Sequence, residues 1–486
     1  MKKNKILAVI CSALAVFSAV SLPLASTGAL KVEAATDTCI SGDYKYNVLD
    51  DGTVSVSKYV GNDSSLQIPS IIDGKKVTKI GKNAFSFCNI VKDVTIPNGV
   101  TSIDDHAFLW CKNLANIALP DRLTSIGASA FYGCESLSSI AIPGSVTLID
   151  SEAFRYCKKL QSITLKNGIK TINKNAFVGC KSLQTITIPE SVETMEDYMF
   201  IDCDSLKSIN VDGKNRNYSS REGVLFNKDK TELITYPCSK NNISYSIPGK
   251  VKTIKTMAFK NCCALRNVTI PTGVVKIGES VFYNNDSLRS VTIPYTVTSI
   301  GYYAFAACDS LKSIAVDSKN KNFVSAEGVL FNKDKTVLMQ YPGGKENISY
   351  IVPNSVVLIN GEAFRDVGCL DRVVIPAGIK GIGSDAFRGG KLSIIYGYTG
   401  TVAEQYADKN DIKFTALSTE NIVAGDINGD GKININDAVR VQKAIVGAMK
   451  FTIEQTLAAD VNYDGKVDIL DATTIQEFSI GLIQSI

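Results

Sequence analysis

The 486-residue chain contains one histidine and one tryptophan. His106 stands in a position typical of a surface turn, so a Ser-His-Asp or Cys-His catalytic set and a histidine-based metal site are excluded. The net charge of +4 is too small to indicate a nucleic-acid partner. Glycosidases need only two carboxylates, so the scarcity of histidine does not exclude that chemistry.

Long apolar runs are absent after the N-terminal segment, so no membrane span is expected in the mature chain. Lys2, Lys3 and Lys5 precede the apolar stretch 6–25, and Val32-Glu33-Ala34 offers a small-residue cleavage site. This order predicts a signal peptide over 1–34 and an extracellular protein. The alternative, a retained membrane helix, is disfavoured by the basic start and by Pro23.

Most of the chain repeats itself with a regular period, which is marked by phenylalanine. The position number rises by 23 from one marking phenylalanine to the next, except for two longer steps of 59 after Phe200 and Phe305. The marking residues are Phe85, Phe108, Phe131, Phe154, Phe177, Phe200, Phe259, Phe282, Phe305, Phe364 and Phe387. Periods of roughly 20 to 50 residues indicate a solenoid.

Within one repeat, Ile140 and Ile142 alternate with small residues as in a short strand, and Pro143 ends that strand. The other expected inward positions of this repeat are Val146, Ile149, Ala153, Phe154, Cys157 and Leu160. A unit this short buries so many apolar groups only when it stacks on its neighbours. We therefore predict a β-rich solenoid.

Each longer step carries an insertion, and the two insertions share most of their sequence. The runs 223–237 and 328–342 both place Asn-Lys-Asp-Lys between two β-rich segments. This pattern predicts a hairpin in each insertion.

The repeat Leu-x-x-Ile-x-Ile-Pro-x-x-Val-x-x-Ile-Gly-x-x-Ala-Phe-x-x-Cys resembles the Treponema-type, or BspA-like, leucine-rich repeat. The resemblance covers roughly 44–417, including a strand-rich N-terminal cap and a C-terminal cap. It implies a surface adhesion or binding protein, although a fold does not fix a function.

Thirteen cysteines in a secreted chain suggest disulfides, but their spacing argues against them. Eight of them lie three positions after a repeat phenylalanine: Cys88, Cys111, Cys134, Cys157, Cys180, Cys203, Cys262 and Cys308. Asn285 and Val367 occupy the same position in other repeats. A column that accepts Cys, Val or Asn indicates a small buried slot with structural thiols.

The acidic end of the chain contains two similar loops, which are offset from each other by 34 in the numbering. Oxygen-bearing residues fall at loop positions 1, 3, 5, 9 and 12, with a backbone carbonyl at position 7, as in calcium-binding loops. The first set is Asp426, Asn428, Asp430, Lys432 (backbone), Asn434 and Asp437. The second is Asp460, Asn462, Asp464, Lys466 (backbone), Asp468 and Asp471. An acidic turn that binds nothing is the alternative, but two copies in tandem favour two Ca²⁺ ions.

An apolar helix is expected after each loop, over 438–446 and 472–480, and no helix pattern enters either loop. This duplicated loop-then-helix arrangement resembles a type I dockerin over 423–486. The resemblance implies calcium binding and docking to a cohesin of a cellulosome scaffold. By position, the implied cohesin contacts are Ile435, Asn436, Gln442, Lys443, Ile469, Leu470, Gln476 and Glu477. The Ser-Thr pair typical of clostridial dockerins is absent from positions 10 and 11.

Aromatic residues follow the repeat phenylalanine by two positions near the N-terminus: Phe87, Trp110 and Tyr156. Stacked repeats would align these rings along one edge, where they either bind the apolar faces of sugars or seal the edge of the core.

The predicted organisation is a signal peptide 1–34, N-terminal cap 35–81, repeats 82–396, C-terminal cap 397–417, linker 418–422 and dockerin 423–486. Two main functions follow. One is a non-catalytic binding or adhesion protein, attached to a cellulosome, that supports polysaccharide degradation or attachment to substrate or cells. The other is a polysaccharide-degrading enzyme, which the absence of a non-repeat domain disfavours. A protease inhibitor or spacer is a third interpretation.

Overall fold

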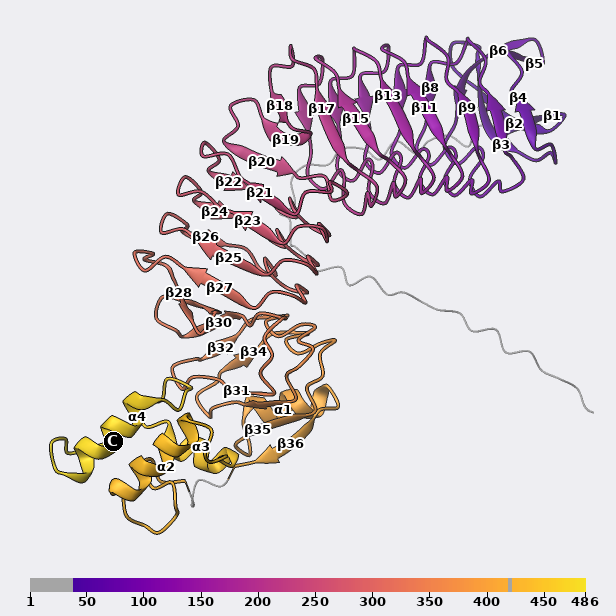
Figure 1. Ribbon diagram of the computed structural model, residues 1–486. Helices are drawn as coiled ribbons and strands as arrows, with labels where there is room; N and C mark the ends of the chain where they lie inside the picture. Colours follow the sequence, from indigo (N-terminus) through magenta and orange to yellow (C-terminus); the bar gives the residue numbers. More distant parts are fainter. Residues whose placement is uncertain (1–37, 418–421) are drawn as a thin grey trace, which may run out of the picture. The chain divides into compact units, whose positions relative to one another are not determined.

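The computed structural model describes residues 38–417 and 422–486. The signal peptide expected over 1–34 lies outside the described residues, as does 418–421 of the expected linker. Residues 38–417 form a β-solenoid, and three of the four described helices fall within 422–486 (Figure 1). This architecture confirms the predicted fold class. No helix in the described ranges is long and apolar enough to cross a membrane.

The solenoid begins with an antiparallel meander. Its strands are β1 (Cys39–Ser41), β2 (Tyr44–Val48) and β3 (Val54–Tyr59). Strand β3 then pairs in parallel with β6 (Lys75–Ile80), to which β5 (Ile71–Ile72) is antiparallel. The meander thus covers one end of the repeat stack, which would otherwise expose an unpaired strand edge.

Each repeat adds one strand to each of two parallel ladders. The first ladder continues from β6 through β8 (Ser102–Ile103), β10 (Ser125–Ile126), β12 (Leu148–Ile149), β14 (Thr171–Ile172) and β16 (Thr194–Met195). The second contains β4 (Ser65–Gln67), β7 (Asp93–Thr95) and β9 (Asn116–Ala118), then β11 (Ser139–Ile142), β13 (Ser162–Leu165), β15 (Thr185–Ile188) and β17 (Ser208–Val211). Ile140 pairs with Ile163, its counterpart in the next repeat, so the register advances by one full period.

Both insertions are antiparallel hairpins, as predicted, and each has a third strand in front of it. The first contains β18 (Tyr218–Arg221), β19 (Val224–Asn227) and β20 (Glu232–Thr235). The second contains β28 (Phe323–Ala326), β29 (Val329–Asn332) and β30 (Val337–Gln340). New parallel ladders start from each insertion, and the buried core divides into three clusters along the solenoid.

The ladders between and after the insertions repeat the same plan. After the first insertion, the first ladder contains β22 (Thr253–Ile254), β24 (Lys276–Ile277) and β26 (Ser299–Ile300). The second ladder contains β21 (Ser244–Ser246), β23 (Asn267–Thr269), β25 (Ser290–Ile293) and β27 (Ser313–Val316). After the second insertion, the first ladder contains β32 (Leu358–Ile359) and β34 (Gly381–Ile382). The second ladder contains β31 (Ser349–Ile351), β33 (Arg372–Val374), β35 (Ile394–Gly397) and β36 (Lys413–Ala416). Helix α1 (Val402–Lys409) lies between β35 and β36 in the C-terminal cap.

The turn that carries the repeat phenylalanine connects one repeat to the next. In the turn of Phe108, His106 and Trp110 have left-handed backbone angles, with φ of 59° and 54°. The N–H groups of these three residues donate to the carbonyls of Ala128, Ala130 and Tyr132 in the next repeat, at 2.9, 2.8 and 2.7 Å. Backbone donors in this turn therefore need the following repeat as their acceptor.

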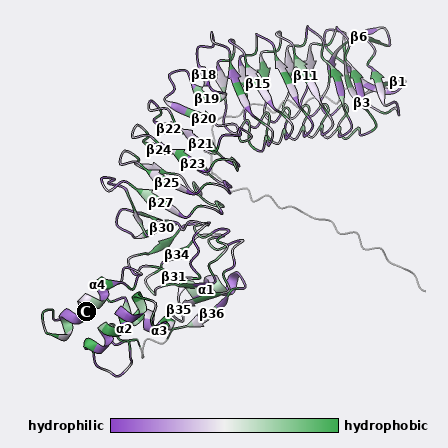
Figure 2. Ribbon diagram, viewed as in Figure 1, coloured by the Kyte–Doolittle hydropathy of each residue, from purple (hydrophilic) through white to green (hydrophobic). Residues whose placement is uncertain are grey.

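Phenylalanine rings stack in sequence inside the solenoid, with centroids 4.9 Å apart for Phe85–Phe108 and 5.3 Å for Phe108–Phe131. All six predicted inward side chains of the repeat of Phe154 are fully buried. Figure 2 shows hydrophobic and hydrophilic residues alternating along the repeats, as the two-sided strands require.

The cysteine column is buried from Cys111 onward, and its thiols are free. The slot is more polar than the sequence indicates, because the Cys111 thiol donates to the Phe85 carbonyl at 2.9 Å and Cys134 to the Phe108 carbonyl at 3.2 Å. Asn285 fills the same slot and donates its side-chain amide to the Phe259 carbonyl at 2.9 Å. Asparagine is thus accepted there as an alternative donor.

Burial should protect the column from alkylation, since it raises the pKa of the Cys111 thiol to about 12 and disfavours the reactive thiolate. We expect iodoacetamide at pH 8 to modify the exposed Cys369 of the native protein and to leave Cys111, Cys134 and Cys157 unmodified. Peptide mass spectrometry measures this, with the guanidinium-unfolded protein as the control in which all four react. Equal rates in the native protein would contradict the buried column.

Candidate functional site

The first acidic loop is closed by backbone N–H groups that donate to its two buried aspartates. Asp426 accepts from Gly429 (2.9 Å) and Asp430 (3.1 Å) through Oδ1, and from Gly431 (2.8 Å) through Oδ2. Asp437 is fully buried and accepts from Ile427 at 3.0 Å. The first and last loop positions are therefore drawn to one side of the loop.

The second loop repeats this arrangement at the equivalent positions. Asp460 accepts from Asp464 (3.0 Å) and Gly465 (2.9 Å), and the fully buried Asp471 accepts from Val461 (3.1 Å). Gly465 has φ of 87°, and its counterpart in the first loop has 79°. Glycine at loop position 6 thus supplies a left-handed turn in both copies.

A helix starts from the end of each loop. These helices, α2 (Ile435–Ile445) and α4 (Ile469–Ser479), include most of the two expected apolar stretches and begin earlier than expected. Loop positions 9 and 12 form a capping box in each copy, so the residues proposed as ligands also fix the helix start. The helices pack through small apolar residues at equivalent positions of the two copies, including Ala438 and Ala472.

The expectation that no helix enters either loop is wrong for the second loop. Helix α3 (Ile453–Ala459) ends directly at Asp460. It begins with a capping box in which the Gln455 N–H donates to Thr452 Oγ1 at 3.2 Å. The short Thr-x-x-Gln signal and the burial of Ala458 and Ala459 stabilise a helix too short to show an amphipathic period.

The loops bury negative charge without a cationic side chain. Across 38–417 and 422–486, no Lys or Arg forms an ion pair with Asp426, Asp437, Asp460 or Asp471. Burial is the main cause that raises the pKa of Asp460, to about 7, and it also raises that of Asp471. A buried carboxylate without a cation beside it is costly, so a bound cation would stabilise this site.

The donor set fits a hard cation. The described ranges contain no group of three or more His, Cys, Asp or Glu residues suited to a metal. Each loop instead combines aspartates with amide and backbone oxygens, which are the ligands that Ca²⁺ prefers. The predicted ligand residues are consistent with Ca²⁺ and unsuited to a metal that needs nitrogen or sulfur.

The residues expected to contact a cohesin lie on the outside of α2 and α4. Ile435, Ile469 and Leu470 are 50%, 57% and 60% exposed, and Asn436 and Lys443 are also exposed. Gln442, Gln476 and Glu477 are partly exposed. Val446 and Ile480, which are not among the expected contacts, are 76% and 70% exposed and occupy equivalent positions of the two copies. Exposed apolar residues in such a repeat are the signal that would have identified them.

The aromatic residues on the solenoid edge pack against its backbone. The Trp110 ring lies where a Cβ on Gly133 would be, and the Tyr156 ring lies likewise over Gly179. From Trp110 to Gly179 aromatic residues and glycines alternate at this position, and each ring fills the space that the glycine of the next repeat leaves. Phe87 differs from both rings, with 63% of its surface exposed.

Tyr132 joins the expected rings, although it is off their column by one position. Its ring lies 5.4 Å from Trp110 and 5.5 Å from Tyr156, edge to face in both cases. The Arg155 guanidinium lies 4.9 Å from the Tyr156 ring centre and donates to Glu152 at 2.7 Å. The structure thus brings Trp110 and Tyr156 into one cluster through Tyr132.

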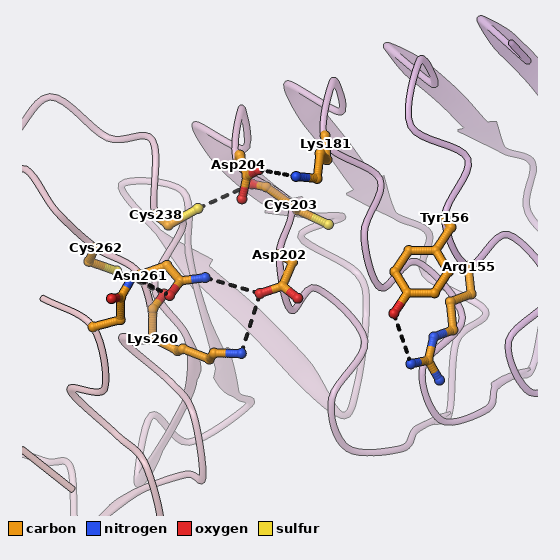
Figure 3. A network of polar contacts seen from close by, with 11 residues as sticks. Arg155, Tyr156, Lys181, Asp202, Cys203, Asp204, Cys238, Lys260, Asn261 and Cys262 are labelled. Carbon is orange, nitrogen blue, oxygen red and sulfur yellow. Dashed lines mark hydrogen bonds and ion pairs between the residues drawn. The ribbon is translucent and has the colours of Figure 1, made fainter. Parts of the chain in front are cut away.

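A polar network crosses the first insertion (Figure 3). Asp202 accepts from Asn261 Nδ2 at 3.0 Å and pairs with Lys260 at 3.3 Å, although the whole hairpin lies between them in the sequence. Nearby, the Cys238 thiol donates to the Cys203 carbonyl at 3.1 Å. These contacts join the repeat before the hairpin to the repeat after it.

Taken together, the solenoid and the duplicated acidic loops define a repeat protein with a small helical module. The profile of the BspA type leucine rich repeat region matches residues 55–157, 78–207, 124–247, 236–326 and 344–407, and that of the dockerin type I domain matches 424–478. The chain therefore belongs to the BspA-type leucine-rich repeat family and carries a type I dockerin domain.

Two solved bacterial structures resemble the solenoid. A leucine rich cell surface protein from Faecalibacterium prausnitzii is 26% identical, with a TM-score of 0.54, over 76% of this chain and 97% of that one. The pneumococcal vaccine antigen PcpA is 21% identical, with a TM-score of 0.54, over 79% and 99%, and supports the fold alone. No curated protein sequence matches the chain significantly.

The packing of Trp110 and Tyr156 over glycines predicts a structural contribution from both rings. We expect Trp110→Ala with Tyr156→Ala to lower the free energy of unfolding by about 2 kcal/mol, because removal of the rings uncovers the backbone at Gly133 and Gly179. Thermal denaturation measures the loss, and Phe87→Ala is the matched control because its ring is mostly exposed. An unchanged melting temperature in the double variant would instead support these rings as a free binding edge.

Proposed function

We propose that this protein is a non-catalytic extracellular binding or adhesion protein that its dockerin attaches to a cohesin of a cellulosome scaffold. The observation that carries the proposal is the pair of matching acidic loops inside the dockerin segment. The solenoid would then hold a polysaccharide or a cell-surface ligand beside the other components of the complex. Such a role would support polysaccharide degradation without performing it.

We propose two Ca²⁺ ions, one in each loop, bound by the residues that the sequence analysis assigns. The paired carboxylates and the capping boxes support this assignment. Calcium would neutralise the buried aspartates and so stabilise the start of each helix. Backbone N–H groups orient two of the proposed ligands. The carboxylates of Asp437 and Asp471 accept from the N–H of loop position 2, at 3.0 and 3.1 Å.

We propose that the cohesin binds the outward residues of α2 and α4, from Ile435 to Lys443 and from Ile469 to Glu477. Their exposure and their duplication support this surface. Val446 and Ile480 extend it at the ends of the helices. Exposed apolar side chains in the middle of a polar rim are typical of protein interfaces.

Binding rather than catalysis is supported by the families that match. The matched segments contain leucine-rich repeats and a dockerin, and neither family is catalytic. The similar solved structure from F. prausnitzii is described as a leucine rich cell surface protein, which is consistent with an extracellular binding role. The aromatic edge and the polar network described on the solenoid give no specific support to a glycosidase or an inhibitor.

Chelation of calcium should unfold the dockerin and leave the solenoid folded, since the buried aspartates repel one another without a counter-ion. We expect EDTA to abolish cohesin binding and to remove one transition from a calorimetric scan. Asp426→Ala with Asp460→Ala should have the same effect. The control is Asp229→Ala, an exposed aspartate in the first hairpin turn. Tight cohesin binding by the calcium-free protein would contradict the proposal.

The two copies of the dockerin differ in charge at one position of the proposed cohesin surface. Lys443 in the first copy corresponds to Glu477 in the second. The similarity of the copies allows two orientations on a cohesin, which differ in the copy that makes the main contact. If one orientation is preferred, Lys443→Glu and Glu477→Lys should change the affinity for one cohesin by amounts that differ about threefold or more. Titration calorimetry measures both variants. Equal changes would show that neither orientation is preferred.

A further inference from the structure

The two insertions interrupt the stack of aromatic rings at equivalent places. The stack ends at Phe200 and resumes at Tyr236, which lies 5.0 Å from Phe259. It ends again at Phe305 and resumes at Tyr341, 5.0 Å from Phe364. A cleft lies at each interruption, between the last complete turn and the hairpin. Because the insertions share their sequence pattern, each residue of the first cleft has an equivalent position at the second insertion, although not all of these positions line the second cleft.

Each cleft is lined by a turn whose backbone donors have lost their acceptors. In the regular repeats the N–H of the repeat phenylalanine donates to the next repeat, and so does that of the residue two positions before it, except in the repeat of Phe177. In the described chain the N–H groups of Tyr303 and Phe305 have no hydrogen-bond acceptor, and neither do those of Tyr198 and Phe200. Such donors need an acceptor from solvent or from a ligand.

The first cleft is closed by charged side chains. Asp197 pairs with Lys255 at 3.3 Å, and Asp202 pairs with Lys260 and Asn261 (Figure 3). Its remaining volume is about 40 Å³. The first cleft is therefore left with little room for a ligand.

The second cleft has the same backbone plan without these pairs. Tyr302 replaces Asp197, Asn360 replaces Lys255, and Ala307 replaces Asp202. Arg365, at the position of Lys260, instead pairs with Glu362 at 2.6 Å. The volume is about 310 Å³, and none of the described residues that line it is charged. This volume is at the lower end of the range for small-ligand sites.

The second cleft offers both polar and aromatic groups. Gln340 is 4% exposed, and its Nε2 donates to the carbonyls of Tyr341 (3.2 Å) and Ala363 (3.0 Å). Among the described residues, no donor reaches the Gln340 Oε1 and no partner reaches the side-chain amide of Asn360. The Tyr302 ring is 66% exposed and lies 6.1 Å from Tyr303.

We propose that this second cleft is a binding site for one or two rings of a neutral carbohydrate. Sugar hydroxyls both donate and accept, so they would satisfy the N–H groups of Tyr303 and Phe305 together with the oxygen of Gln340. The apolar face of a sugar ring would pack on Tyr302. An uncharged lining gives no partner to a carboxylate or an ammonium group, which disfavours acidic sugars and charged peptides.

The proposal deepens the proposed function, on which it rests for the presence of a polysaccharide beside the protein. The probes are neutral tetrasaccharides of β-1,4-linked glucose, xylose and mannose, with tetragalacturonate and a tetra-alanine peptide as comparison arms. Titration calorimetry would use the chain without residues 1–34, in calcium. Cohesin affinity, measured on the same samples, separates failure of this site from failure of the attachment role.

We expect at least one neutral tetrasaccharide to bind, and Tyr302→Ala or Asn360→Ala to weaken it by about tenfold or more. Tyr302→Asp with Asn360→Lys rebuilds the ion pair of the first cleft and should abolish binding. Asp197→Glu with Lys255→Arg keeps an ion pair over the first cleft and is the matched control, which should leave affinity unchanged. Thermal denaturation verifies that each variant is folded, and both single substitutions are at positions with exposed or partly exposed side chains.

Three results would overturn the proposal. The first is that no neutral tetrasaccharide binds, which would mean that solvent alone satisfies the free donors. The second is stronger binding of tetragalacturonate or of the peptide. The third is neutral-sugar binding that survives both cleft variants but is lost in Trp110→Ala, which would place the site on the aromatic edge instead.

Discussion

The hydrogen bonds from each phenylalanine turn to the next repeat hold the solenoid together. Left-handed residues on both sides of the phenylalanine direct their N–H groups along the stack, so a repeat is incomplete without its successor. At the last turn, where no repeat follows, the Phe387 N–H donates instead to the hydroxyl of Tyr406 in helix α1, at 3.3 Å. The C-terminal cap therefore ends the stack by supplying the missing acceptor.

The same dependence gives the hairpin insertions their significance. A hairpin continues the strands and the buried core, but it lacks the phenylalanine turn and its carbonyls. The N–H groups of the preceding turn are left without acceptors. Side chains that follow the hairpin in the sequence then decide whether the opening is closed or accessible. Ion pairs close one opening, whereas amides and tyrosines leave the other accessible.

The dockerin depends on a different constraint, the burial of carboxylates next to a helix start. In each copy one aspartate belongs to the capping box of a helix and is also a proposed calcium ligand, so folding and the proposed ion binding would share the same groups. The duplication also produces two similar outer surfaces.

The sequence alone determined the repeat period, the inward residues, the two hairpins and the acidic loops. These features depend on which residues recur at fixed spacing, and stacking turns a fixed spacing directly into contact. The cysteine column followed for the same reason, although its role as a row of donors to phenylalanine carbonyls needed the structure.

Tertiary structure decided the features that depend on residues outside that period. Tyr236 and Tyr341 resume the aromatic stack at positions that the phenylalanine spacing does not mark, and Trp110 needs Gly133 opposite it. Helix α3 was missed because its single short segment cannot show a period. The difference between the two clefts arises from pairs such as Asp197 and Lys255, whose contact depends on how the hairpin spaces its neighbours.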